Sequence, residues 1–555
     1  MRATRNNDLA NCFSNSSEQI VSIGEKDKKK SVLENLPAFI KEMHENRTCW
    51  IHDLEFYDIT YNCIGVNPSQ LIHESNISFS LACTKLYSEI TNLTNMQSGG
   101  IGLIDFDSDM SQYIHGETET EVEDILFQLL ILLNLPVRKG CELAYVTINF
   151  GLCTTNKGKM ISRGLLRAYS RQQFVFPNLV FKIKAGINRY ESDINYDIFE
   201  LACKTTACCM NPTYLNTDSK FNAEIPPEKF GVMGCRTRIA TNRFNSASSL
   251  NRGNIASTTI NLVQLALKCD GDIKTFFSLL NDTMQIAKKC LIYRMDILTA
   301  KPAVAYIKEN GLYLNSNSES GFDTLKNGTL AIGFIGLWDA MAVLIKKDFT
   351  ESDNLRKYYH QSYKIVEYMR KTTDTFSKEE NLNFSLLASS AEGVSGYFAE
   401  YDSKHYEEAK SVTDKGYYTN SFHIPVSANI SCFEKLSLEA PFHALCNGGH
   451  ITYVELKEAP DENNEAVKEL IEFACQQDIG YFGINYPLDV CCDCSEKGLF
   501  KEVCDKCGSR NIRRLRRVSG YLSDENNFTF GKSQELKNRK SNENLICSYD
   551  ILNSI

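Results

Sequence analysis

The chain has 555 residues, of which 43% are hydrophobic and 23% are charged, and its formal net charge is −9. These proportions are ordinary for a globular protein, and the length exceeds the roughly 250–300 residues at which a single core stops growing. The negative charge argues against a protein whose main task is to coat nucleic acid. Because no apolar run approaches the about 18 residues of a membrane span and the N-terminus lacks a signal peptide, we expect a cytoplasmic protein.

The predicted elements alternate between helices and strands along the chain. Residues 1–35 are polar and predict an extended or partly ordered lead-in, and residues 33–47 predict a short helix interrupted at Pro37. Further on, the patterns predict strands at 145–150 and 179–184, helices at 260–268 and 276–294, and an exposed amphipathic helix at 460–477. This alternation indicates an α/β architecture, which can close into a barrel.

Two polar clusters have more than one interpretation. Asp105, Asp107 and Asp109 could suggest a cation site, but their strict alternation favours one face of an exposed strand. The arginines between residues 510 and 517 would suit a zinc ribbon that grips nucleic acid, and such a run is more often a solvated face or the lining of a contact within the chain.

Four of the 21 cysteines form two short chelating pairs, Cys491-x-x-Cys494 and Cys504-x-x-Cys507, separated by nine residues. Four thiolates at this spacing can close a tetrahedron around zinc, and a site with no open position is structural. An iron–sulfur cluster is the alternative metal centre. Cys492 is the alternative first ligand, although the gap between Cys491 and Cys494 is the commoner one.

Gly520 lies in the segment Arg517-Val-Ser-Gly-Tyr521. By itself this segment predicts a turn, in which glycine supplies a backbone conformation that other residues avoid. Arg-Val-x-Gly-Tyr near a C-terminus, however, resembles the signature of glycyl radical enzymes. The resemblance implies that Gly520 stores a radical, that oxygen would cleave the chain there, and that a radical-SAM activase creates the radical.

Several further segments, between about residues 44 and 539, resemble class III (anaerobic) ribonucleotide reductases. Paired cysteines just before the glycine are characteristic of that family. Met233-Gly-Cys235-Arg-Thr237 resembles its finger loop, and residues 251–254 resemble its Arg-x-Asn element. The other similar segments are residues 50–57, followed by Cys63, and residues 147–150, 418–425 and 448–453. Trp50 departs from the family, which often has a histidine at this position.

The resemblance implies an α/β fold of the glycyl radical and ribonucleotide reductase type, with a ten-stranded barrel. We expect three parts: a polar lead-in at 1–35 without an ATP-cone, a catalytic barrel at 36–485, and a zinc-binding and glycyl radical domain at 486–555. Without a cone, we expect no shut-off by dATP. The implied partners are the activase, a second copy of the chain, and dNTP or ATP effectors at the dimer interface, with neither a membrane nor nucleic acid.

The implied reaction reduces ribonucleoside triphosphates. The Gly520 radical would take a hydrogen atom from Cys235, whose thiyl would abstract the 3′-hydrogen of the substrate. Formate would supply the reducing equivalents, with Cys63 moving a hydrogen atom on the other ribose face; a redoxin-dependent branch also exists, and Cys63 could be a structural thiol. Asn254 would hydrogen-bond the ribose hydroxyls or formate.

The substrate-binding candidates are His52, Met233 and Thr237. For the phosphates the candidates are Thr419, Asn420 and Ser421, which could instead form an ordinary turn.

Two other functions stay open at this point. Pyruvate formate-lyase uses two adjacent cysteines, and Cys208-Cys209 offers such a pair, although packing explains it equally simply. A non-catalytic zinc ribbon that binds nucleic acid is the alternative from a different class.

Overall fold

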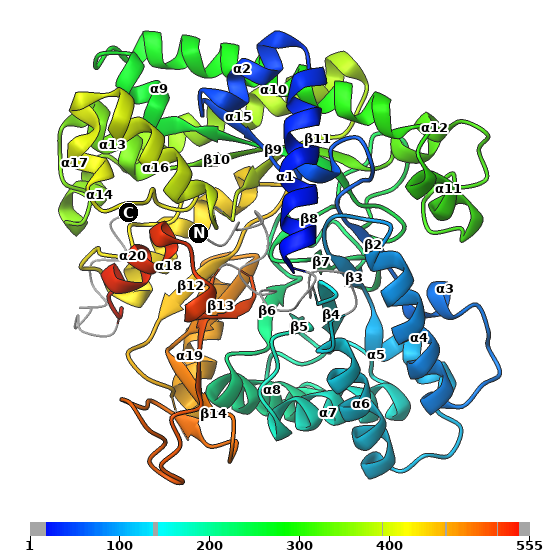
Figure 1. Cartoon of the computed structure of the whole chain (residues 1–555). Coiled ribbons are helices and arrows are strands. Elements are labelled where there is room, and N and C mark those ends of the chain that lie inside the picture. The colour runs from blue at the N-terminus through cyan, green and yellow to red at the C-terminus, as the bar shows by residue number, and fades with distance from the viewer. Residues whose placement is uncertain (1–17, 137–142, 391, 461–462, 519, 543–555) are drawn as a thin grey trace.

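The computed structural model describes residues 18–136, 143–390, 392–460, 463–518 and 520–542. Its largest sheet has seven strands, and its neighbours pair in parallel except for β13 and β6 (Figure 1). In sheet order the strands are β12 (Thr452–Glu455), β13 (Tyr481–Asn485), β6 (Thr213–Asn216), β5 (Asn178–Ile183), β4 (Val146–Phe150), β3 (Ile101–Leu103) and β2 (Ile64–Val66). The predicted strands at 145–150 and 179–184 are thus β4 and β5.

A second sheet has four strands, of which only β1 runs antiparallel to its neighbour. In order these are β1 (Cys49–Ile51), β9 (Asn254–Asn261), β10 (Thr329–Ile335) and β11 (Phe384–Ala388). Single bridges connect the two sheets: Gly65 of β2 pairs with Arg252, just before β9, and Leu387 of β11 pairs with Gly449, just before β12. The α/β class is confirmed, but a continuous ten-stranded barrel is not, because the described strands form separate sheets.

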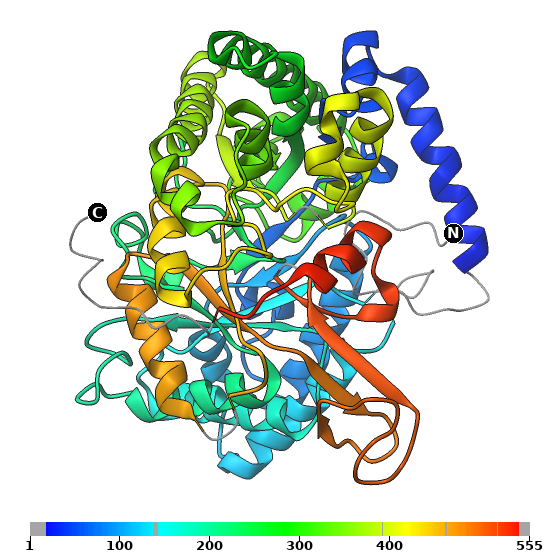
Figure 2. The ribbon, with the colours of Figure 1, turned by 90° about the vertical axis from the view of Figure 1, so that its left-hand side faces the viewer.

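Helices cover the outer faces of both sheets (Figures 1 and 2). Those of the first half are α1 (Glu18–Asn35), α2 (Ala38–Glu45), α3 (Pro68–Ile72), α4 (Phe79–Thr94), α5 (Phe106–Met110), α6 (Glu119–Leu133), α7 (Asn156–Arg171) and α8 (Tyr196–Cys209). The rest are α9 (Leu262–Lys268), α10 (Ile273–Leu298), α11 (Pro302–Glu309), α12 (Gly321–Leu325), α13 (Leu337–Ile345), α14 (Ser352–Lys357), α15 (Tyr359–Glu380), α16 (Val394–His405), α17 (Lys410–Thr413), α18 (Cys432–Leu445), α19 (Asn464–Gln476) and α20 (Phe530–Asn538). Among the described residues, no helix is long and apolar enough to cross a bilayer.

The N-terminal segment differs in part from its prediction. Of the lead-in predicted to be extended or partly ordered, residues 18–35 form helix α1, and residues 1–17 lie outside the described residues. Lys28 and Lys29 of this helix pair with Asp58 and Glu55 at 2.7 and 3.3 Å. The predicted break at Pro37 is present, since α1 ends before it and α2 begins after it. The amphipathic helix predicted at 460–477 is α19.

The C-terminal part forms a small sheet of its own, which projects from the body of the molecule (Figure 2). Its strands, in sheet order, are β15 (Lys497–Gly498), β14 (Leu488–Cys491), β16 (Ile512–Arg517) and β17 (Leu522–Asp524). Strand β16 runs from the cysteine pairs toward Gly520, and so this sheet determines where the glycine lies.

The acidic cluster at residues 105–109 is not on an exposed strand, contrary to the prediction. It lies at and within helix α5, and Asp107 is fully buried. One carboxylate oxygen of Asp107 accepts hydrogen bonds from the backbone amides of Gly151 and Cys153 and from the Ser162 hydroxyl, at 3.0, 3.2 and 2.9 Å. Asp107 therefore fixes the turn that follows β4.

Asp107→Asn is expected to lower the free energy of unfolding by about 3 kcal/mol, because an amide loses charge-assisted hydrogen bonds and turns a donor toward buried donors. The midpoint of urea unfolding measures this effect. Glu74→Gln is the matched control, since the Glu74 carboxylate is half exposed and its ion pair with Lys85 stabilises little. Equal midpoints for the two variants would contradict the structural role of Asp107.

Candidate active site

A short hairpin enters the space between the two large sheets and carries Cys235 in its turn. Its strands are β7 (Val232–Met233) and β8 (Thr237–Arg238). The Asn149 side chain, from β4, donates to the carbonyl of Val232 and accepts from its amide, at 3.0 and 2.9 Å. Thr147 and Asn178, from β4 and β5, donate to the Gly234 carbonyl at 3.0 and 3.1 Å. Polar side chains on two buried strands thus hold the hairpin in place.

Gly520 lies directly against Cys235. A Cβ atom at Gly520 would be 1.9 Å from the Cys235 carbonyl oxygen and 2.3 Å from its Cα, so no other residue fits without displacing a backbone. The Arg517 guanidinium, which is buried, donates to the Gly520 carbonyl at 3.3 Å. Residue 519 lies outside the described residues. The glycine is therefore positioned by its close packing against Cys235 and by the hydrogen bond from Arg517.

Tyr521 anchors the other end of the glycine loop. Its hydroxyl donates to the Glu392 carboxylate at 2.6 Å, and its ring packs against Tyr145 and Phe176 with centroids 5.6 and 5.9 Å away. Burial raises the pKa of Tyr521 well above its usual value, so the phenol stays protonated as a donor. The loop is thus fixed by a buried hydrogen bond and by aromatic packing.

A cavity opens beside this contact and brings together five of the ten predicted catalytic and substrate-binding residues. It is lined by His52, Cys63, Met233, Cys235 and Thr237, among others. The Cys63 thiol donates to the Met233 sulfur at 3.8 Å and accepts from the backbone amide of Asn254 at 3.3 Å. Burial raises the pKa of Cys63 to about 12, so this residue is a thiol and not a thiolate near neutral pH.

His52 is neutral in this cavity, because burial lowers its pKa to about 4. Its Nε2 lies 2.7 Å from the Thr259 hydroxyl, which in turn lies 2.6 Å from the Ser389 hydroxyl. Arg236, also buried, donates to the Ala388 and Ser389 carbonyls at 3.3 and 3.4 Å. Its Nε and second terminal nitrogen have no hydrogen-bond partner among the described residues. An incompletely satisfied, buried cation at a cavity favours an anionic ligand.

The Thr419–Ser421 turn is not part of this cavity. Thr419 and Asn420 line a second cavity together with Arg517 and Val518. Sequence reasoning instead missed Ser389, Ser390 and Glu392, which line the first cavity where β11 leads into α16. The sequence did contain a signal for these residues, because an apolar strand at 384–388 is followed by small residues and then by a helix. This pattern can place the backbone amides at a helix start near an anion.

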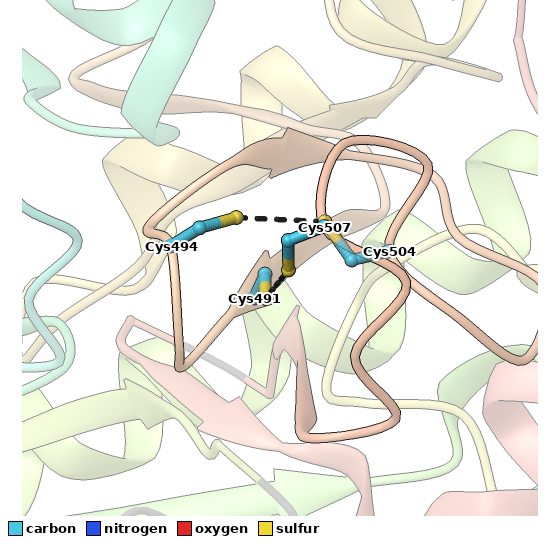
Figure 3. Close-up of side chains that lie close together, drawn as sticks. All are labelled: Cys491, Cys494, Cys504 and Cys507. Atoms are coloured by element: carbon cyan, nitrogen blue, oxygen red, sulfur yellow. Dashed lines mark hydrogen bonds between the residues drawn. The ribbon is translucent and has the colours of Figure 1, made fainter.

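The four paired cysteines converge at the far end of the C-terminal sheet (Figure 3). The sulfur atoms of Cys491 and Cys507 are 3.5 Å apart, those of Cys494 and Cys504 are 3.6 Å apart, and all four lie within 4.8 Å of one another. Cys492 is exposed and is not part of the group. In a tetrahedral site with four thiolates about 2.3 Å from one zinc ion, the sulfur atoms are separated by distances similar to those observed here. The donor set therefore fits tetrahedral zinc.

Three of the five arginines after these cysteines make polar contacts within the chain, whereas Arg510 is exposed. Arg514 and Arg516, on β16, bind the buried Asp489 of β14 at 2.7 and 2.9 Å. Arg517 donates to the Met210 carbonyl at the end of α8. These bonds connect the cysteine group to the glycine loop and do not create a basic surface for nucleic acid.

The α/β fold is shared with solved glycyl radical enzymes: the one from Archaeoglobus fulgidus superposes with a TM-score of 0.57 at 10% identity, over 94% of this chain and 84% of that one. The chain belongs to the family of anaerobic ribonucleoside-triphosphate reductases, whose model matches residues 8–541.

Individual relatives agree with this assignment. The anaerobic ribonucleoside-triphosphate reductase of Escherichia coli is 31% identical over 457 residues, which cover 78% of this chain but only 63% of that protein. The protein of the same name from Enterobacteria phage T4 is 28% identical over 582 residues, 92% of each chain. The anaerobic ribonucleotide reductase from Thermotoga maritima, solved with dATP and CTP, superposes with a TM-score of 0.73 at 17% identity, over 95% of this chain and 92% of that one.

Gly520→Ala is expected to expel the glycine loop from its place beside Cys235, because the added methyl group would overlap the backbone of that residue. Hydrogen–deuterium exchange should rise at residues 520–524. Gly498→Ala, in β15 of the C-terminal sheet, is the matched control, since its Cβ would meet its nearest neighbour at an ordinary 3.5 Å. Unchanged exchange in Gly520→Ala would show that the loop does not need a glycine for packing.

Proposed function

We propose that this chain reduces ribonucleoside triphosphates to 2′-deoxyribonucleoside triphosphates by radical chemistry. The observation that carries the proposal is the contact between Gly520 and Cys235 at a cavity that also holds the Cys63 thiol. Membership of the anaerobic reductase family favours this function over a formate-lyase and over a zinc ribbon that binds nucleic acid. The Cys208-Cys209 pair supports the same choice, because neither cysteine lines the cavity beside Gly520.

Hydrogen atoms would move along a short path. A radical at Gly520 takes the hydrogen atom of the Cys235 thiol, and the thiyl then abstracts the 3′-hydrogen of the ribose. The substrate radical loses its 2′-hydroxyl as water, and formate supplies two electrons and leaves as carbon dioxide. Cys63 donates and recovers a hydrogen atom on the other ribose face, which requires an S–H group; its raised pKa, caused by burial, supplies one.

We assign the substrate contacts to residues around the cavity. His52, Met233 and Thr237 line it, and Asn254 has a buried side-chain oxygen without a partner among the described residues, which suits a ribose hydroxyl. We place the phosphates near Ser389 and Ser390, which follow β11 directly and precede α16, because the Thr419–Ser421 turn faces another cavity. Arg236 provides the nearby positive charge.

We further propose that residues 486–555 form a zinc-binding and glycyl radical domain on a catalytic barrel of residues 36–485. The bridges at both sheet edges would close ten strands, β9–β10–β11–β12–β13–β6–β5–β4–β3–β2, into one ring. A radical-SAM activase would create the radical, and a homodimer would bind effector nucleotides. The solved relative that holds dATP and CTP supports nucleotides as both substrates and effectors.

With activase and formate under anaerobic conditions, Cys235→Ser should retain the Gly520 doublet in electron paramagnetic resonance and form no dCTP from CTP. Cys63→Ser should also retain the doublet and lose formate-dependent turnover. Cys83→Ser is the control, because Cys83 is a buried thiol packed in the core outside the site. Turnover by Cys235→Ser would refute the thiyl assignment, and full activity without formate would refute only the choice of reductant.

Purified protein is expected to hold one zinc ion per chain. Cys504→Ser should lose most of this metal and destabilise the C-terminal sheet, since a structural zinc contributes folding free energy directly. Cys492→Ser should keep the metal, because Cys492 is outside the group. Elemental analysis gives the stoichiometry, and iron with sulfide in place of zinc would contradict the assignment.

A further inference from the structure

Helix α8 ends in two adjacent cysteines that the proposed reaction does not use. The sulfur atoms of Cys208 and Cys209 are 3.4 Å apart; Cys209 is fully buried and Cys208 is partly exposed. The Lys497 ammonium, from β15, lies 3.1 Å from the Cys209 sulfur. Within the described part of the chain, Lys497 forms no ion pair with a carboxylate. An ammonium directed at a pair of sulfur atoms is balanced when the pair carries one negative charge.

The environment distinguishes Cys208 from the structural thiols of the core. A hydrogen bond from Cys209 and, more weakly, the Lys497 ammonium lower the pKa of Cys208 to about 6. Burial instead raises the pKa of Cys290 to about 12. Because the thiolate is the nucleophilic form of cysteine, the partly exposed member of the pair is also the reactive one.

We propose that Cys208 and Cys209 form a thiol–disulfide exchange site, at which Cys208 attacks a small disulfide and Cys209 resolves the mixed product. This inference goes beyond the proposed reductase function and does not depend on it. The ligand class is a low-molecular-weight disulfide, because Cys208, which makes the first attack, is only partly exposed.

The two steps balance as follows. The Cys208 thiolate attacks one sulfur of the disulfide, whose S–S bond breaks and releases one thiolate. Cys209 then gives its proton to the thiolate released in the first step and attacks the Cys208 sulfur, which releases the second thiolate. The protein loses two electrons to the small disulfide, which becomes two thiols. Adjacent Cα atoms are about 3.8 Å apart, closer than in most disulfides, so the bond formed is strained and easily reduced again.

Oxidation of Cys208 and Cys209 would affect the glycine loop through Met210. Met210 follows Cys209 directly, and its carbonyl accepts a hydrogen bond from Arg517, which also donates to the Gly520 carbonyl. Closing a ring between Cys208 and Cys209 changes the last turn of α8 and moves this acceptor. The oxidised pair therefore loosens the loop that carries Gly520, and reduction restores it.

The test uses the full, zinc-loaded chain kept anaerobic and treated with oxidised glutathione. Remaining thiols are alkylated at acidic pH, and tryptic peptide 205–220, which contains only these two cysteines, is analysed by mass spectrometry. The wild-type peptide should lose two hydrogens and carry no adduct, whereas Cys209→Ser should keep glutathione on Cys208. Lys497→Gln should react at least about fivefold more slowly, because loss of the ammonium reduces the thiolate fraction.

Cys83→Ser is the matched control and should react as the wild type does. A fully alkylated wild-type peptide, or a lasting glutathione adduct on it, would overturn the proposal. Hydrogen exchange at residues 512–518 and 520–524 tests the coupling: it should rise on oxidation of the wild type and stay constant in Cys208→Ser and Cys208→Ala. Equal exchange in the oxidised and reduced wild type would overturn the connection to the glycine loop.

Discussion

The close approach of two backbones, at Gly520 and Cys235, is the constraint on which the rest of the site depends. It leaves no room for a side chain, so the position of each loop is constrained by the other. The hairpin obtains this precision from Asn149 and its polar neighbours on buried strands, and the glycine loop obtains it from Arg517 and Tyr521. Segments far apart in the sequence therefore meet because each is independently anchored to the same sheet framework.

Burial also determines the chemistry that the cavity can support. A medium of low polarity favours the neutral form of each titratable group, so that Cys63 remains a thiol, Tyr521 a phenol and His52 an uncharged imidazole. Acid–base catalysis would need groups that ionise near neutral pH. Transfer of whole hydrogen atoms separates no charge, and so a buried, mostly neutral site suits it. The Arg236 guanidinium and the Glu392 carboxylate are exceptions, and the unsatisfied donors of Arg236 are the group that an anionic substrate would balance.

The sequence was informative where chemistry requires fixed residue types, and less so where only packing decides. The cysteine spacing, Cys235 and Gly520 were recognisable as motifs, and β4 and β5 followed from their apolar patterns. The same patterns could not show that Asn149 and Asn178 face inward to hold a hairpin more than fifty residues away. Alternation at Asp105, Asp107 and Asp109 suggested a strand, because a sequence does not reveal that one of the carboxylates is buried on backbone amides. Thr419 and Ser389 lie in similar runs of small residues, so the sequence could not show that Ser389, and not Thr419, lines the cavity beside Cys235.

Strand β16 fixes the distance between the cysteine group and Gly520, and this has a consequence for how the family can vary. An extended strand advances about 3.4 Å per residue and alternates its faces, so one inserted or deleted residue would shift Gly520 by that distance and reverse the side on which Arg517 lies. In the loop between the cysteine pairs, Phe500 and Lys501 are held by hydrogen bonds with Asp489 and Arg514, whereas residues 502 and 503 are exposed. Length should therefore be nearly invariant between Ile512 and Gly520 and freer to vary at residues 502–503, even among relatives whose residues there have diverged.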